Sequence, residues 1–315
     1  MAGPGRRGFG LAALGLLARP ARAGGLTGPI SLLVAGAPGG NADGWARSIA
    51  PFLERHLPRA QIAVANRPGE GGLAAARSLA GTVPDGHVLG AVATPLLLAR
   101  AIAAGQSAML ERLDFLGAIA EEPVLLVGHP GLAPTLGALR ARGEQALLAT
   151  PPPGNAAQLA GLAFARARPL TLLAFANAQT ARQAVIAGNV AAAMLALPEA
   201  LAALSDDRLA GLGLAAATRC PLLPEMPTLA EQGVAVRIAA HRGFALPLGT
   251  PQPLREALGA ALKAMVADAE FVAAAEAEGY LPRYLPAATW DGLLRATARD
   301  LATQWRGDPW LPRAD

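Results

Sequence analysis

Short apolar stretches alternate with turns and helical patterns along most of this chain, and this alternation restricts the fold more than any other feature. The run Ile30–Ala35 is rich in leucine and β-branched residues, which favours a buried strand. Two glycines follow, and Trp45, Ile49 and Leu53 then recur at helical spacing. We expect further strands at Gln61–Ala65, His87–Ala93, Val124–Gly128, Ala146–Ala149, Leu170–Ala174, Val190–Leu195 and Leu209–Ala215.

The order of these elements predicts an α/β fold. A strand, a helix and a second strand in succession usually form a parallel pair with the helix on its face, so we expect largely parallel sheets. The chain has 315 residues, of which 53% are hydrophobic, and this is enough for two cores. No flexible linker separates the first series of elements from the second. We therefore predict two α/β lobes with a ligand cleft between them.

The segment APGGNADGWAR, residues 37–47, has the features of an anion-binding site. Gly39 and Gly40 allow a ligand to approach the backbone because neither has a Cβ atom. The N–H groups of Asn41, Ala42 and Asp43 lie where a helix begins, without partners and at the positive end of its dipole. The helix dipole stabilises an acid such as Asp43 by about 0.3–1 kcal/mol, although an acid beside a bound anion repels it.

Two local expectations follow from single residues and pairs. Pro51 lies inside the first helical pattern, so that helix should kink or restart there. The acidic pairs Glu121-Glu122 and Asp206-Asp207 lie in connecting segments, and we expect both pairs to face water.

The residues that usually carry catalysis or bind metals form no recognisable set. The histidines are scattered, and no His or Cys pair has the spacing of a metal site. No G-x-S-x-G nucleophile elbow and no GK[ST] phosphate loop occur. The single cysteine, Cys220, is interpreted as a small apolar core residue. We therefore predict a binding protein rather than an enzyme, with no metal and no cofactor.

The first 23 residues have the layout of an export signal peptide. Arg6 and Arg7 precede a short apolar run at Phe9–Ala18, and residues 21–23 (ARA) fit the small-x-small cleavage pattern. The RRGFG run also resembles a twin-arginine signal. The apolar run is too short to cross a bilayer, and no other run approaches the required length. These features predict a periplasmic protein.

The charge balance argues against a nucleic-acid partner. The whole chain has 27 basic and 23 acidic residues, for a net charge of +4. Four of the basic residues and none of the acidic ones lie in residues 1–23, so the remainder is balanced at 23 of each. No basic stripe interleaved with aromatic residues occurs. We expect a monomer that binds no nucleic acid.

Six segments, in order, resemble the solute-binding receptors of the tripartite tricarboxylate transporter system, the Bug receptor family. The family's opening strand and its P-G-G-x-x-D loop are matched by residues 29–47, PISLLVAGAPGGNADGWAR. Its next two signatures are matched by residues 66–72, NRPGEGG, and by residues 84–90, PDGHVLG. QLAG (158–161) stands where the family has HLAG. The family pattern R-x-P-x-L-P-x-[VM]-P-T-x-x-E-x-G is closely matched by residues 219–233, RCPLLPEMPTLAEQG. The family's return strand resembles residues 243–251, GFALPLGTP. The matches extend over residues 28 to 305.

This resemblance implies the type II periplasmic-binding-protein fold, with a small carboxylate in the cleft and membrane transporter subunits as partners. Lobe one would comprise residues 24–123 and 240–315, and lobe two residues 124–239. The acid corresponding to Asp43 would orient ordered water or accept a hydrogen bond from a ligand amine. By the same likeness, NRPGEGG would be a structural turn to the side of the cleft.

The candidate site combines the glycine loop with segments of both lobes. Thr94 and Pro95 would form a second wall of lobe one, although Thr94 also suits a helix N-cap. The candidate ligand-binding residues are Gly39, Gly40, Asn41, Ala42, Asp43, Thr94, Pro95, Gly154, Asn155, Ala156, Phe175 and Asn177.

The lobe-two loop departs from the family pattern. Ala156 and Ala157 replace the usual hydroxyls, Gln158 replaces the histidine, and Ala191 replaces the acid of the G-x-V-D turn. Backbone donors at the start of the helix remain, but side-chain hydrogen bonds worth about 0.5–1.5 kcal/mol each are missing. We therefore predict a ligand less polar than a tricarboxylate, either a monocarboxylate or an aromatic acid, unless the receptor has lost its site.

Two other functions fit parts of the sequence. A ligand-sensing subunit would close on its ligand like a transport receptor and then present the closed form to a signalling partner. An enzyme that uses the glycine loop for a phosphate ligand would need an acid–base pair, and the sequence offers no recognisable one.

Overall fold

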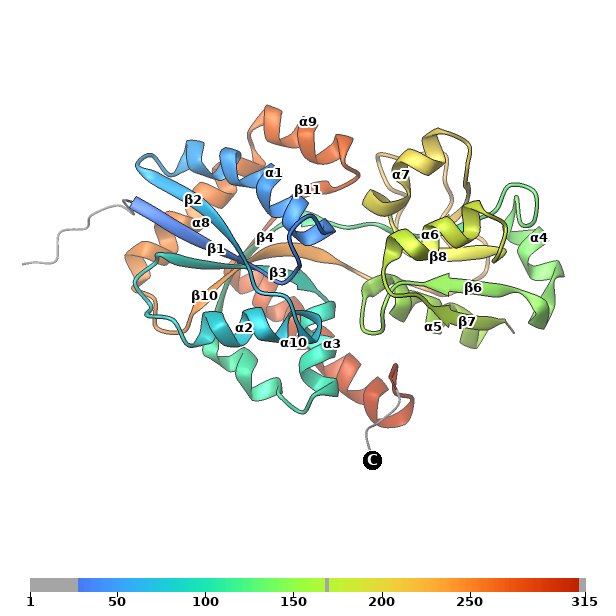
Figure 1. Cartoon of the computed structure of the whole chain (residues 1–315), viewed down its shortest axis with the longest axis horizontal. Coiled ribbons are helices and arrows are strands. Elements are labelled where there is room, and N and C mark those ends of the chain that lie inside the picture. Colours follow the sequence, from blue (N-terminus) through green and yellow to red (C-terminus); the bar gives the residue numbers. More distant parts are fainter. Residues whose placement is uncertain (1–27, 168–169, 312–315) are drawn as a thin grey trace, which may run out of the picture.

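The computed structural model describes residues 28–167 and 170–311, which form two β-sheets flanked by helices (Figure 1). The expected signal peptide, residues 1–23, lies outside the described residues. The first sheet consists of β1 (Gly28–Val34), β2 (Ala60–Asn66), β3 (Val88–Thr94), β4 (Leu113–Glu121), β10 (His241–Pro247) and β11 (Leu281–Pro286). Its strands lie in the order β11-β4-β10-β3-β1-β2. The second sheet, in the order β7-β6-β8-β5-β9, consists of β5 (Val124–Gly128), β6 (Leu147–Thr150), β7 (Thr171–Ala174), β8 (Ala192–Ala196) and β9 (Ala210–Leu214).

Helices cover both faces of each sheet. One face of the first sheet packs against α1 (Asn41–His56), α8 (Gln252–Val266) and α9 (Ala269–Ala277), and the other against α2 (Leu73–Ala80), α3 (Leu96–Ala103) and α10 (Ala287–Gly307). The second sheet packs against α4 (Leu136–Ala141) and α5 (Ala156–Ala167) on one face, and against α6 (Ala178–Ile186) and α7 (Leu197–Ser205) on the other. Short 3₁₀ turns occur at η1 (Glu70–Gly72), η2 (Ser107–Arg112) and η3 (Gly143–Gln145).

The prediction of largely parallel sheets is wrong for several strand pairs. Strand β1 is parallel to β2 and β3, and β6 is parallel to β7 and β8, as the alternation predicts. Strand β10, however, is antiparallel to β3 and β4, and β5 is antiparallel to β8 and β9. The reason is that β4 leads directly into β5 of the other sheet and β10 returns from it, so these strands are not joined by a helical crossover.

The returning strand β10 packs closely against β4 at a glycine. A Cβ atom on Gly243 would lie 2.2 Å from the carbonyl oxygen of Gly117 and 2.7 Å from the Trp290 ring. Real Cβ atoms do not approach other atoms so closely, so this crossing requires glycine. The contact fixes the strand that carries the preceding residue, Arg242, into the region between the sheets.

Helix α1 does not restart at Pro51, which was one of the two outcomes predicted from the sequence; the other, a kink, stays a prediction. It runs without a break from Asn41 to His56. Proline removes the hydrogen bond to the carbonyl four residues earlier, which belongs to Arg47. Both Pro51 and Arg47 are exposed, so water can satisfy that carbonyl. The helix therefore tolerates the proline on its outer face.

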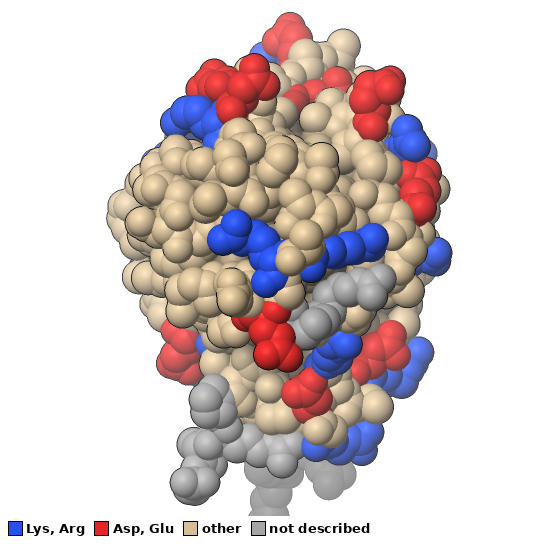
Figure 2. Space-filling model, turned by 90° about the vertical axis from the view of Figure 1, so that its right-hand side faces the viewer, with Lys and Arg blue, Asp and Glu red and all other residues tan. Residues whose placement is uncertain are grey.

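The surface and core agree with other expectations. Cys220 is buried in the second core, and burial raises the pKa of its thiol, as expected for an unreactive core residue. Asp206 and Asp207 are exposed, as predicted. On the face in Figure 2, several basic side chains lie in a short row across the middle, and acidic side chains lie above and below this row. None of the helices within the described residues is long and apolar enough to cross a bilayer.

Candidate functional site

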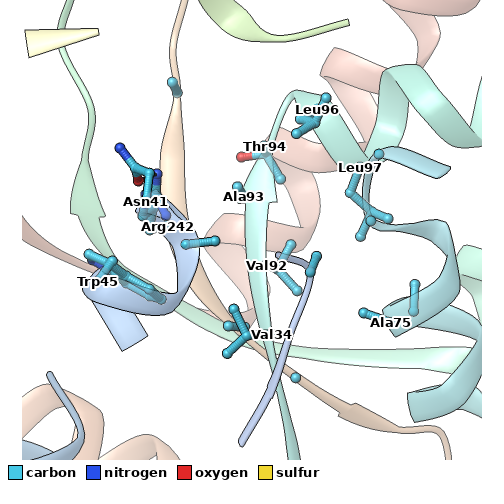
Figure 3. Close-up of a pocket in the computed structure, with 18 of the residues that line it drawn as sticks. Val34, Asn41, Trp45, Ala75, Val92, Ala93, Thr94, Leu96, Leu97 and Arg242 are labelled. Atoms are coloured by element: carbon cyan, nitrogen blue, oxygen red, sulfur yellow. Dashed lines mark hydrogen bonds between the residues drawn. The ribbon is translucent and has the colours of Figure 1, made fainter. Parts of the chain in front are cut away.

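A cavity of about 200 Å³ lies between the two sheets (Figure 3). Most of its wall comes from the first sheet and its helices, including residues of β1, β3, α1 and α2. Four residues close it from the second sheet's side: Asn155 and Ala156 where α5 begins, and Ala196 and Glu199 where α7 begins. The cavity is therefore built by segments that are far apart in the sequence.

Four helices begin at this cavity. Asn41 and Ala42 belong to the first turn of α1, Leu96 to that of α3 and Ala156 to that of α5, while Ala196 immediately precedes α7. The first N–H groups of a helix have no partner within the helix, and the dipole places partial positive charge there. Four such ends around one cavity favour a bound anion.

The glycine loop before α1 is held by Asp43, which is only 4% exposed. Its carboxylate accepts hydrogen bonds from the Gly39 N–H at 2.9 Å, from Arg47 Nε at 3.0 Å and from Asn66 Nδ2 at 3.0 Å. The bonds from Arg47 and Gly39 lower the pKa of Asp43 to about 2. Asp43 does not line the cavity, so the structure gives this acid a role in shaping the loop beyond its favourable place in the helix dipole.

The structure brings some of the predicted site residues together at the cavity and places others elsewhere. Asn41, Ala42, Thr94, Asn155 and Ala156 line it, whereas Gly39, Gly40, Asp43, Pro95, Gly154, Phe175 and Asn177 do not. No bound ligand tests these assignments, and they stay predictions.

Several of the predicted site residues already use their polar groups within their own loops. The Gly40 N–H donates to the Ala37 carbonyl at 3.1 Å, and the Gly154 N–H donates to the Gln158 side chain at 3.0 Å. Asn177 accepts a hydrogen bond from the Thr180 N–H at 2.8 Å and so caps α6. These contacts indicate that the α1 and α5 loops are shaped from within, and that the Gly154 N–H is already bonded to Gln158.

The NRPGEGG loop lies closer to the cavity than expected. The family resemblance implied a position to the side of the cleft, but Gly71 and Gly72 line the cavity wall. Gly71 has φ of +65°, and a Cβ atom there would lie 2.5 Å from Arg100 Nε. Only glycine fits both the left-handed backbone and this contact, so the loop is a structural turn that also forms part of the wall.

A buried ion pair forms the polar end of the cavity, and local sequence reasoning missed it. Arg242 donates from Nη2 to Glu122 Oε1 at 2.7 Å and to Asn41 Oδ1 at 2.9 Å. Its guanidinium also lies over the rings of Trp45 and Tyr280, at 5.2 and 5.3 Å from their centroids. The expectation that Glu122 faces water is wrong, because the β4–β5 connection passes between the sheets and buries it.

The charge states at this end follow from the pairing. Burial alone lowers the pKa of Arg242, but the Glu122 carboxylate more than compensates and raises that pKa above its usual range. Burial raises the pKa of Tyr280, so its hydroxyl stays neutral. Glu199 is half-buried, and burial together with the Glu122 charge raises its pKa to about 7.

The opposite wall is apolar. Val34 of β1, Val92 of β3 and Leu97 of α3 project around this part of the cavity in Figure 3, and Leu33 and Leu79 complete it. The cavity therefore has one end with Asn41, Arg242 and Thr94 and another end without polar side chains. Such a cavity suits a ligand with an anionic head and an apolar body.

The described residues contain no cluster of three or more His, Cys, Asp or Glu side chains that could hold a metal ion. The cavity also holds no paired nucleophile and base, since its titratable side chains are Glu122, Glu199 and Arg242.

Comparisons with known proteins agree with this geometry. Residues 45–288 match the profile of a family described as the tripartite tricarboxylate transporter family receptor. A UPF0065 protein of Agrobacterium vitis is 27% identical over 256 residues, which cover 76% of this chain and 72% of that protein.

Solved structures resemble the whole described fold. An R. palustris protein with adipate has a TM-score of 0.77 and is 21% identical in sequence. The match covers 89% of this chain and 97% of that protein's chain. MatC from Rhodopseudomonas palustris, with bound malate, has a TM-score of 0.73 and is 23% identical in sequence. The match covers 88% of this chain and 98% of the MatC chain. These likenesses confirm the predicted fold, that of two-lobed periplasmic binding proteins.

Proposed function

Because this chain belongs to the tripartite tricarboxylate transporter receptor family, we propose that it captures a small carboxylate in the cavity between its two sheets and delivers it to membrane subunits of that transporter type. Members of this family are solute-binding proteins, so the chain is a solute receptor and not an enzyme. The phosphate-using enzyme considered from the sequence is thereby excluded.

The convergence of four helix N-termini on one cavity carries the proposal of an anionic ligand. The fixed charges of Arg242 and Glu122 cancel each other, so the attraction for an anion comes from the dipoles of the helices that begin here, α1, α3, α5 and α7. At α7 only the dipole acts, because the Ala196 and Leu197 N–H groups already donate to the Glu199 carboxylate and to the Pro123 carbonyl. Two structural relatives contain malate and adipate, which are carboxylates, and this supports the same ligand class here.

The apolar wall narrows the class of carboxylate. A second or third carboxylate placed against Val34, Val92 and Leu97 would lose its hydration without gaining a partner. An aliphatic or aromatic body would instead bury apolar surface there. We infer that the ligand is a monocarboxylate with an apolar body.

The two sheets support the proposed division into lobes. Strands of the first sheet come from residues 28–121 and 241–286, and those of the second from residues 124–214. We infer that lobe one is 24–123 plus 240–315 and that lobe two is 124–239. Capture would then close the lobes on the ligand, because residues 155–156 and 196–199 face the first-lobe wall across the cavity.

Export and assembly complete the proposal. We infer that residues 1–23 direct the chain to the periplasm, by the twin-arginine route in view of RRGFG, and that the mature protein works as a monomer. A transporter that must pick up a ligand from the periplasm needs a receptor on that side, which agrees with the family assignment.

Thermal unfolding of residues 24–315 against a panel of mono-, di- and tricarboxylates tests the proposed function. At about 1 mM, a ligand with micromolar affinity adds about 4 kcal/mol to the free energy of unfolding and raises the midpoint by several degrees. Ala93→Phe fills the cavity from β3 and should abolish the shift, whereas Ala63→Phe on the exposed surface of β2 should retain it. Absence of any shift in the unmodified chain would contradict the proposal.

A further inference from the structure

The anion-favouring cavity also contains two acids, which an anion receptor does not need. Glu122 and Glu199 both line it, together with a single cation, Arg242. Carboxylates normally repel a carboxylate ligand, so their presence requires a chemical explanation.

The two acids are not equivalent. Glu122 is paired with the Arg242 guanidinium at 2.7 Å, and both side chains are buried. The carboxylate of Glu199 accepts a hydrogen bond from the Ala196 N–H at 3.2 Å, which is a capping contact at the start of α7. Arg182 donates to the backbone carbonyl of Glu199 at 2.6 Å, not to its carboxylate. Among the residues that the structure describes, no cation pairs with the Glu199 carboxylate.

The charged and titratable groups around Glu199 favour its neutral form. Burial and the Glu122 charge raise its pKa, while the Ala196 bond and the more distant charges of Arg242 and Arg182 lower it by less. Tyr280, on the far side of Arg242, is neutral. When two carboxylates share one cation in a cavity of low polarity, the less well paired acid holds a proton. A protonated Glu199 has an O–H donor where an ionised one has only acceptors.

We propose that Glu199 is a specificity-determining residue that binds the ligand carboxylate in its neutral form, as a hydrogen-bond donor, and thereby couples anion capture to one proton. This inference rests on the proposed function. In acidic medium the proton is already on Glu199; in alkaline medium it is taken from solvent as the ligand binds. No proton is transferred to the ligand.

The coupling has a predictable size. With a pKa of about 7 in the free receptor, Glu199 is almost fully protonated near pH 5.5 and about one-tenth protonated near pH 8. The apparent dissociation constant rises as the competent fraction falls, so affinity should weaken about tenfold between these pH values. Glu199→Gln is a permanent neutral donor whose amide oxygen can still accept from Ala196, so its affinity should not change with pH.

Two measurements test the inference. The first is a ¹³C NMR titration of the Glu carboxyl groups without ligand, in the unmodified chain and in Glu199→Gln. A resonance that titrates near pH 7 should be present in the first and missing from the second. The second is calorimetric titration with benzoate, adipate and phenylalanine near pH 5.5 and pH 8. Glu144→Gln, the same change at an exposed site on η3, is the matched control and should keep the pH dependence of the unmodified chain.

The outcomes separate this inference from the proposed function. A tenfold loss of affinity at high pH that disappears in Glu199→Gln supports it. Equal affinity at both pH values, or a Glu199 resonance that titrates below pH 5, overturns it and leaves carboxylate binding intact. Tighter binding of phenylalanine at high pH, lost in Glu199→Gln, overturns it in favour of an ionised Glu199 that binds an ammonium group. If neither benzoate nor adipate binds at either pH and no member of the carboxylate panel shifts unfolding, the proposed function fails and this inference fails with it.

Discussion

Replacing Glu122 by glutamine should destabilise the protein strongly, because it leaves the Arg242 guanidinium buried without its counter-ion. Arg242 is 8% exposed and Glu122 is 9% exposed, so water cannot take the place of the lost carboxylate. Both Nε and Nη2 of Arg242 donate to Glu122, at 3.1 and 2.7 Å. Removing one partner of a buried ion pair typically costs about 3–5 kcal/mol.

The remaining contacts of Arg242 place the expected loss at the lower end of that range. Asn41 Oδ1 still accepts from Nη2 at 2.9 Å, and the rings of Trp45 and Tyr280 still face the guanidinium. Each cation–π contact contributes about 0.5–2 kcal/mol. We therefore expect Glu122→Gln to lower the free energy of unfolding by about 3 kcal/mol. The double variant Glu122→Gln with Arg242→Met removes both charges and should lose less than the single variant.

Urea unfolding followed by circular dichroism and tryptophan fluorescence measures this loss. The adjacent Glu121→Gln is the control, since Glu121 pairs at 3.1 Å with an Arg283 side chain that is 62% exposed. Exposed pairs contribute about 0–1 kcal/mol, so this variant should unfold almost like the unmodified chain. The reasoning is refuted if Glu122→Gln costs less than about 1 kcal/mol, or if the double variant is less stable than the single one.

Two further predictions concern residues first proposed as ligand contacts. Asn177→Ala should lower the free energy of unfolding by about 0.5–2 kcal/mol, because it removes the N-cap of α6. Any carboxylate-induced rise of the thermal midpoint should persist in this variant, and its loss would show that Asn177 belongs to the binding site. Asp43 has a pKa lowered to about 2 from 3.8, so its stabilising contribution is present above pH 4 and is lost as the pH falls toward 2. Thermal midpoints between about pH 2 and 5 should therefore fall less steeply in Asp43→Asn, and parallel curves for the two proteins would contradict this.

The predicted site residues that line the cavity were all found from local patterns. Asn41 and Ala42 follow a strand and two glycines, and Asn155 and Ala156 follow a loop rich in proline and glycine. A strand, a turn and a helix in sequence position the helix start without help from distant residues. The same reasoning found Thr94 at the end of β3, and all of these residues line the cavity.

The charged end of the cavity could not be predicted in this way because it is made by long-range pairing. Glu122 and Arg242 are 120 positions apart, and Asn41 and Arg242 are 201 apart. An acid in a connecting segment is usually exposed, so the pattern around Glu122 indicated water. Its burial depends on the chain passing from β4 into the second sheet and returning through β10. The hydrophobic periodicity of a single segment does not predict which strands connect the two sheets. Glu199 was missed for a related reason, since an acid at the third position of a helix is usually a capping residue alone.

The charges of the cavity bear on how many carboxylates its ligand carries. Arg242 and Glu122 neutralise each other, so the partial charges of the four helix N-termini supply the attraction for an anion. A neutral Glu199 adds a hydrogen-bond donor for a carboxylate without adding charge. A tricarboxylate would bring two further charges into a space bounded by valine and leucine, and one of them would meet Glu122 or Glu199. Alkaline pH ionises Glu199 and so increases the repulsion between the cavity and each additional carboxylate of the ligand. Discrimination against multiply charged ligands should therefore increase with pH. The same acid that weakens binding of a monocarboxylate at high pH therefore sharpens the selectivity for one.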